Sequence, residues 1–136
     1  MKNKLISSAL LLTLWASQTL AQAINFETTK WNAALEKAKQ QNKMVYLDVF
    51  TDWCGPCKMM AKNYFPDPQV AEFYNKNFVN VSIDAEKGEG LAIAKQYNIT
   101  GYPTNLFIDP NTKKIVYKTM GAPSNKEGFI DNGKVA

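Results

Sequence analysis

Two different spacings of hydrophobic positions divide the chain into predicted helices and strands. Residues 44–50 form a nearly continuous apolar run of strand length, which is typical of a strand covered on both faces. Residues 78–84 alternate between apolar and polar positions and predict a second strand. A helix with Thr28 or Thr29 as its N-cap is predicted before the first strand. Its apolar face consists of Trp31, Ala34, Leu35 and Ala38.

Helix-breaking and turn residues set the limits of the elements in the middle of the chain. A helix is predicted to run from the cysteine pair to about Tyr64, and the Pro-Asp-Pro segment at residues 66–68 ends it. Residues 69–77 predict a further helical piece, and residues 86–90 form a loop. A short helix after this loop is predicted from Leu91, Ala94, Lys95 and Tyr97.

The order of these elements predicts an α/β fold with a four-stranded mixed sheet flanked by helices. The right-handed crossover rule makes the first two strands parallel neighbours. Residues 104–109 and 115–119 predict an antiparallel hairpin around a Pro-Asn-Thr turn. A last helix over residues 126–136 is expected to be short, because Gly128 and Gly133 are poor helix formers.

The beginning of the chain has the pattern of a secretory signal peptide. Lys2 and Lys4 give it a positive start, residues 5–14 form an apolar run, and residues 21–23 read Ala-Gln-Ala, a small-x-small cleavage pattern. The apolar run is too short to cross a bilayer. We therefore predict a signal peptide at residues 1–23 and an exported domain at residues 24–136, which is 136 − 23 = 113 residues. The domain is expected to be periplasmic or secreted, without a stable membrane anchor.

Composition and charge fit a globular domain and argue against a nucleic-acid partner. Hydrophobic residues make up 46% of the chain, enough for a packed core. The formal net charge of +4 comes from scattered lysines, with no arginine and no basic stripe. Nucleic-acid binding is therefore not expected.

Cys54 and Cys57 are the only cysteines and carry the candidate chemistry. Structural zinc needs four ligands, which two cysteines without a histidine cannot supply. Covalent haem attachment would need a histidine where Lys58 stands. Cuprous ion stays open, because Met59 and Met60 add soft thioether ligands. A structural disulfide between these cysteines would close a very small loop and stabilise the fold little.

Thiol–disulfide exchange fits the local structure predicted around the pair. Cys54 falls in the first turn of a helix, where free backbone N–H groups and the helix dipole favour a thiolate. Gly55 leaves room for a partner, and Pro56 is tolerated in a first turn because its missing N–H is not needed there. Cys57 lies one turn further on, close enough to attack a mixed disulfide formed at Cys54.

The six residues that begin at Trp53 resemble the Trp-Cys-Gly-Pro-Cys-Lys active-site motif of the thioredoxin family. Asp48, six residues before the first cysteine, and the Gly-Tyr-Pro-Thr segment at residues 101–104 lie at that family's spacing. The resemblance covers about residues 44–122. The flanking segments are similar to those of exported thioredoxin-like proteins and of the soluble domains of membrane thiol reductants.

This resemblance implies a role for each residue of the motif. Cys54 would attack the substrate disulfide, Cys57 would resolve the mixed disulfide, and Asp48 would be the buried carboxylate that takes the proton from Cys57. Pro103 would be a cis-proline that faces the cysteines. The substrate surface that the family implies consists of Trp53, Gly55, Pro56, Tyr102 and Pro103.

The chain departs from the family pattern at two positions. Asn80 stands where the family pairs a lysine near the buried aspartate, so proton handling is expected to differ. Tyr102 precedes the proline where an aliphatic residue is usual, which changes the peptide-binding surface.

The chain is thus identified as a member of the thioredoxin family and is predicted to be a thiol–disulfide oxidoreductase that reduces protein disulfides. It needs no bound cofactor, because the cysteines carry the electrons. The expected partners are disulfide-containing proteins and a membrane thiol-electron donor. Three alternatives stay open: a disulfide isomerase or oxidase on the same fold, a non-catalytic thiol module and a copper-binding module.

Overall fold

A computed structural model of the chain describes residues 23–136. The signal peptide predicted for residues 1–23 lies, apart from Ala23, outside the described residues. Within residues 23–136, no helix is long and apolar enough to cross a membrane.

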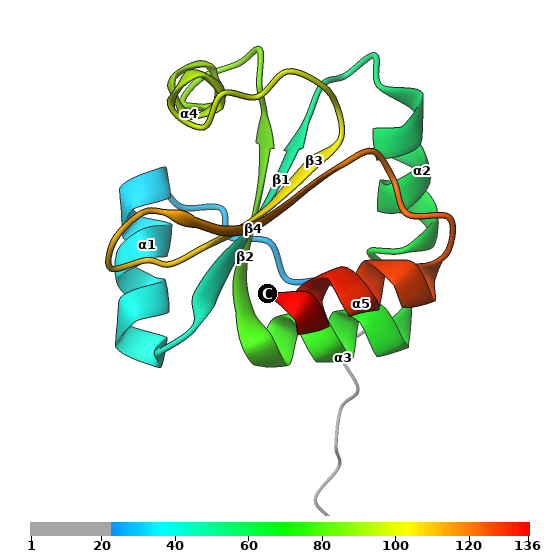
Figure 1. The fold of residues 1–136 in the computed structure, drawn as a ribbon, viewed down its shortest axis with the longest axis horizontal. Coiled ribbons are helices and arrows are strands. Elements are labelled where there is room, and N and C mark those ends of the chain that lie inside the picture. The colour runs from blue at the N-terminus through cyan, green and yellow to red at the C-terminus, as the bar shows by residue number, and fades with distance from the viewer. Residues whose placement is uncertain (1–22) are drawn as a thin grey trace, which may run out of the picture.

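Five helices and four strands make up the described part of the chain (Figure 1). The predicted order of elements is confirmed, and the turn that ends the second helix separates it from a third. The elements are α1 (Trp31–Gln41), β1 (Met44–Phe50), α2 (Gly55–Asn63), α3 (Pro68–Asn77), β2 (Phe78–Asp84), α4 (Gly90–Gln96), β3 (Thr104–Ile108), β4 (Ile115–Met120) and α5 (Lys126–Val135).

The four strands form one mixed sheet in the order β2-β1-β3-β4. The predicted parallel pair of β1 with β2 and antiparallel pair of β3 with β4 are confirmed, and β3 is also antiparallel to β1, which the sequence had not indicated. The register places Asp48 beside Ser82 of β2 and Asn105 of β3. Phe26 adds an isolated parallel bridge to Asn80 and so extends the sheet beyond β2.

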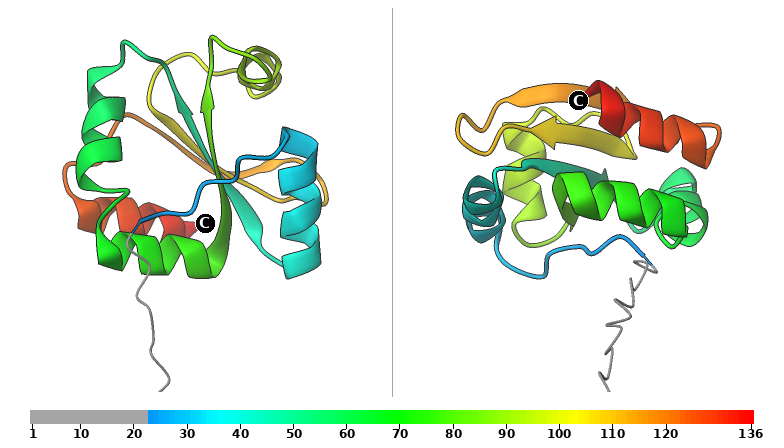
Figure 2. Two further views of the ribbon diagram at one scale, coloured as in Figure 1. Left: turned by 180° about the vertical axis from the view of Figure 1, so that it is seen from behind. Right: turned by 90° about the horizontal axis from the view of Figure 1, so that it is seen from below.

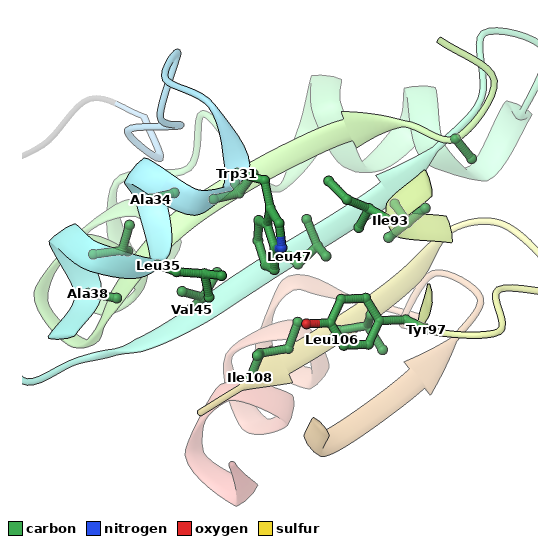
Figure 3. Close-up of a cluster of buried hydrophobic side chains, with 14 residues drawn as sticks. Trp31, Ala34, Leu35, Ala38, Val45, Leu47, Ile93, Tyr97, Leu106 and Ile108 are labelled. Atoms are coloured by element: carbon green, nitrogen blue, oxygen red, sulfur yellow. The ribbon is translucent and has the colours of Figure 1, made fainter. Parts of the chain in front are cut away.

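Helices cover both faces of the sheet (Figures 1 and 2). α1 and α4 lie on one face, over an aliphatic core that also contains Trp31 and Tyr97 (Figure 3). α2, α3 and α5 lie on the other face and enclose a second core, which is rich in aromatic rings. Because β1 is buried on both faces, its nearly continuous apolar sequence is explained by its central position.

Three local features differ from the sequence-based expectations. The N-cap of α1 is Lys30 rather than Thr28 or Thr29, and the free N–H of Trp31 instead donates to the Glu89 carboxylate at 3.1 Å. Leu91, predicted to help define α4, is 59% exposed. Ile93, by contrast, is a buried residue of α4 and belongs to the core on this face of the sheet. Contacts with other elements, which the sequence of α4 does not encode, decide which of its residues are buried.

α5 forms a ten-residue helix although it contains two glycines. Gly133 lies so close to α3 that a Cβ atom there would stand 2.5 Å from Phe73 Cε1. The absence of a side chain thus lets α5 approach α3, which offsets the low helix propensity of glycine. Phe129 anchors the helix, since it is fully buried and stacks on Tyr74 with ring centroids 4.4 Å apart.

We expect Phe129→Ala to lower the free energy of unfolding by about 3–5 kcal/mol, because it removes a fully buried aromatic ring and leaves a cavity. Urea denaturation followed by circular dichroism measures the loss. Val135→Ala, at an exposed position of the same helix, is the control and should change stability by no more than about 0.5 kcal/mol. If both variants lose the same small amount, α5 is not anchored by Phe129.

Candidate active site

Cys54 and Cys57 form a disulfide at the beginning of α2, with an S–S distance of 2.09 Å. Cys54 is the N-cap of the helix, and its Sγ accepts the backbone N–H of Cys57 at 3.2 Å. Gly55 and Pro56 occupy the first helical turn, as the sequence predicts. A Cβ atom at Gly55 would have no neighbour within 4 Å, so this side of the disulfide faces open space.

The two cysteines differ little in their exposure to solvent. In the disulfide form Cys54 is 4% exposed and Cys57 is 7% exposed. Exposure of the disulfide form therefore gives no preference for one cysteine over the other.

Asp48 is a buried carboxylate in the middle of β1, on the face of the sheet that α2 covers. Its Oδ2 accepts the hydroxyl of Ser82 at 2.7 Å. Burial raises the pKa of Asp48 from 3.8 to about 6, and the hydrogen bond from Ser82 lowers it in part. A pKa near 6 makes this carboxylate a proton acceptor that can work close to neutral pH.

The neighbour of Asp48 on β2 is Ser82 and not Asn80, the residue that we expected near it. Asn80 lies two positions earlier on the strand, pairs with Tyr46, and donates through its amide to Asn75 at 3.2 Å. The alternation along β2 places Asn80 and Ser82 on the same face of the sheet. Only the register of the parallel pair decides which of the two lies beside Asp48.

A loop from the other end of the chain lies beside Trp53. The Tyr102–Pro103 peptide bond is cis, and the carbonyl of Pro103 accepts the N–H of Gly121 at 2.8 Å. Trp53 and Tyr102 meet edge to face, with ring centroids 5.7 Å apart. Trp53, the predicted surface residue before the first cysteine, is therefore in contact with the proline loop.

Trp53 is 67% exposed but is held in place by the loop after β2. Its indole N–H donates to Glu86 at 2.9 Å, and Lys87 of the same loop forms an ion pair with Asp52. Neither Glu86 nor Lys87 was predicted as part of the site. Their position follows from the ends of β1 and β2 lying side by side, which the predicted parallel pairing could have indicated.

Asp48 and Cys57 share a cleft of about 340 Å³ between α2 and the sheet. Most of its wall is apolar, and Cys54 is not part of it. The lining residues are Phe26, Asp48, Phe50, Thr51, Asp52, Cys57, Lys58, Ala61, Phe65 and Ser82. The structure thus places Asp48 and Cys57 in the wall of the same cleft.

No group of three or more Cys, His, Asp or Glu side chains within residues 23–136 could hold a metal ion. The two methionines that follow Cys57 belong to the aromatic core: Met60 is fully buried there, and Met59 packs against it. Their role in packing accounts for their presence beside the cysteines.

A four-stranded mixed sheet covered by helices, with a Cys-Gly-Pro-Cys disulfide at the start of a helix and a cis-proline before the third strand, defines a protein of the thioredoxin fold. A family model described as Thioredox_DsbH, protein of unknown function DUF255, matches residues 9–135. The chain belongs to this family.

Similar proteins share the fold and cover much of the chain. A protein from Bacteroides thetaiotaomicron, proposed to be a disulphide isomerase, is 39% identical, with a TM-score of 0.73 over 85% of this chain and 93% of that one. A structure described as DsbH oxidoreductase has a TM-score of 0.72 at 23% identity, over 90% of both chains, and supports the fold.

The curated relatives are much longer proteins. The thiol:disulfide interchange protein DsbD of Haemophilus influenzae is 30% identical over 130 residues, which are 87% of this chain but 21% of that protein. The DsbD protein of Tatumella citrea is 34% identical over 112 residues, 80% of this chain and 19% of its own length. The chain therefore spans about a fifth of each relative.

We expect Asp48→Asn to stabilise the oxidised protein above pH 6. The raised pKa means that the folded state binds the proton more tightly than the unfolded state, so the stability present below about pH 3.8 is lost as the pH rises through about 6. The gap between 3.8 and about 6 corresponds to at most about 3 kcal/mol.

Urea denaturation of Asp48→Asn and the parent protein across this pH range measures the effect. The advantage of the variant should grow from about pH 4 to pH 6 and then stay level. Asp131→Asn on the exposed surface of α5 is the control for loss of one carboxylate. A stability difference that is independent of pH would show that the Asp48 carboxylate is not destabilised by burial.

Proposed function

We propose that the protein reduces disulfide bonds of other proteins in an exported compartment. One observation carries this proposal: Cys54 caps α2 and its sulfur accepts the N–H of Cys57. After reduction, the same N–H and the helix dipole stabilise a thiolate at Cys54. A thiolate is the form of cysteine that attacks disulfides.

The reaction uses both cysteines and the buried carboxylate. The Cys54 thiolate attacks one sulfur of the substrate disulfide, and the other sulfur leaves as a thiolate and takes up a proton. Cys57 then gives its proton to Asp48 and attacks Cys54 Sγ in the mixed disulfide. This step releases the second substrate thiol and forms the Cys54–Cys57 disulfide, so two electrons have passed to the substrate.

The substrate would bind along the surface beside the disulfide. Gly55 faces open space, and Trp53 stands against Tyr102 on one side. The loop with the cis Tyr102–Pro103 bond lies next to these rings, and the backbone of Tyr102 would pair with an extended peptide. In this arrangement the aromatic pair contributes apolar contact, while the proline loop aligns the peptide.

A membrane thiol-electron donor is the proposed source of electrons, because the protein must be reduced again after each turnover. Similarity to a segment of DsbD supports a place in such a chain of thiol exchanges. The predicted signal peptide at residues 1–23 supports export to the periplasm or secretion.

Disulfide isomerisation is the second candidate function. It is favoured by the 39% identity to the Bacteroides thetaiotaomicron protein that is proposed to be a disulphide isomerase. An isomerase forms the same mixed disulfide but needs a pair with a more oxidising reduction potential, whose reduced form is more stable than that of a strong reductant. The reduction potential therefore separates the two functions.

We expect a reduction potential of about −270 to −200 mV for the Cys54–Cys57 pair. Among the described residues, a single backbone N–H donates to Cys54 Sγ. One such hydrogen bond stabilises the reduced form only moderately, so the pair is expected to remain reducing. Equilibration with glutathione or dithiothreitol buffers, read by thiol alkylation, measures it. A value more oxidising than about −180 mV would move the protein to the oxidase or isomerase class.

We expect Cys57→Ser to accumulate mixed disulfides with substrate proteins, because the attack by Cys54 still occurs but the resolving thiol is missing. Cys54→Ser should accumulate few, and the variant with both substitutions is the background control. Non-reducing electrophoresis and mass spectrometry of the exported fraction identify the trapped proteins. Equal trapping by Cys54→Ser and Cys57→Ser would show that the nucleophile has been assigned wrongly.

A further inference from the structure

The cleft behind Cys57 is larger than proton transfer requires. Its volume of about 340 Å³ lies in the range of small-molecule sites, whereas a single water occupies about 30 Å³ in the liquid. Three phenylalanine rings form its walls, from three separate segments: Phe26, Phe50 and Phe65. Concave sites with apolar walls and few polar groups are typical of small-ligand binding.

The polar groups of the cleft are separated into a floor and a mouth. At the floor lie the buried Asp48 carboxylate, its donor Ser82 and Cys57. At the mouth lie the exposed residues Lys58 and Ala61, both on α2. The floor thus carries a carboxylate, and the mouth carries an ammonium group.

The charge at the mouth is available to a ligand. Asp52, the other charged residue there, is paired with Lys87. Within residues 23–136, no carboxylate lies at ion-pair distance from Lys58. Asp52 also lies near enough to Lys58 to interact with its charge, and a carboxylate bound at the mouth would give Lys58 an ion-pair partner at closer range.

We propose that this cleft binds a small amphipathic anion, an aryl carboxylate, with its ring against the phenylalanine side chains and its carboxylate against Lys58. The orientation follows from charge, because the Asp48 carboxylate at the floor disfavours a second anion beside it. The ring would lie on apolar walls, where aromatic contacts are favourable.

Binding has a consequence for the cysteines that rests on the proposed function. Cys57 and Asp48 line the same cleft, so a bound ring would separate them from solvent and stand in the space through which the proton is exchanged. The ligand would slow resolution of the mixed disulfide by Cys57 without covering the face at Cys54, which is not part of the cleft. The site would thus regulate the second half of the reaction.

The test is titration of the oxidised, isotope-labelled protein with 3-phenylpropionate, followed by NMR shifts of backbone and methyl groups. We expect saturable shifts confined to the lining residues of the cleft. The neutral analogue 3-phenylpropanol should bind about 2- to 5-fold more weakly, the effect of one exposed ion pair. Lys58→Gln should weaken the binding of 3-phenylpropionate by the same factor and abolish the difference in affinity between the two compounds.

Ala61→Leu tests the location, because a larger side chain at the mouth occupies the entrance to the cleft. It should reduce the affinity at least about tenfold, which corresponds to obstruction of the site. Lys62 is exposed on the same helix and does not line the cleft, so Lys62→Gln and Lys62→Leu are matched controls and should bind as the parent does.

Three results would overturn the proposal: no saturable shifts at millimolar ligand, equal binding of acid and alcohol by the parent protein, or unchanged affinity in Ala61→Leu. The NMR titration requires no turnover, so its failure is distinct from a failure of the proposed reductase activity. Conversely, a protein that binds the acid but traps no substrate through Cys57→Ser would retain the site and lose the reductase function.

Discussion

The pairing of β1 on both of its edges is the interaction on which the rest of the structure depends. β1 forms seven residue pairs with β2 and five with β3, and its five central residues are buried. The loop that follows β1 leads directly into the disulfide at the start of α2. A central, doubly paired strand is the most rigid support that a small sheet offers, so the first turn of α2 begins from a fixed point.

This central position also explains how a carboxylate can be buried beneath the cysteines. Asp48 is fixed between two paired strands and accepts a single side-chain hydrogen bond, from Ser82. Burial of an unpaired charge is costly, and here the cost appears as a raised pKa. The aromatic core on the same face, in which Phe129 of α5 closes over Tyr46 and Tyr74, contributes the packing that keeps the strand in place.

The site itself is assembled from segments far apart in the sequence. The loop after β2 holds Trp53 through Glu86, and the loop before β3 brings Tyr102 against the same indole. Gly90 makes the first of these loops feasible, because a Cβ atom there would lie 1.8 Å from the carbonyl oxygen of Asp84. The surface that Trp53 and Tyr102 form is therefore separate from the cleft behind Cys57, which Cys54 does not line.

The sequence by itself determined the kinds of elements, their order and the chemistry at the pair. Hydrophobic period and breaker residues are local properties, so they sufficed for the strands and for the limits of α2. The motif around Cys54, together with Asp48 and Pro103, indicated the family because the spacing of these residues is itself a sequence property.

Tertiary structure alone decided the features that depend on register and on contacts between distant segments. Ser82 rather than Asn80 lies beside Asp48, because the register of the parallel pair decides which residues are neighbours. The alternation of apolar and polar residues does not specify that register. α1 starts without the predicted threonine cap, since its free N–H finds Glu89 from another loop. The cleft is lined by Phe26, by α2 and by the ends of strands, and no local sequence pattern records how far apart packed elements stand.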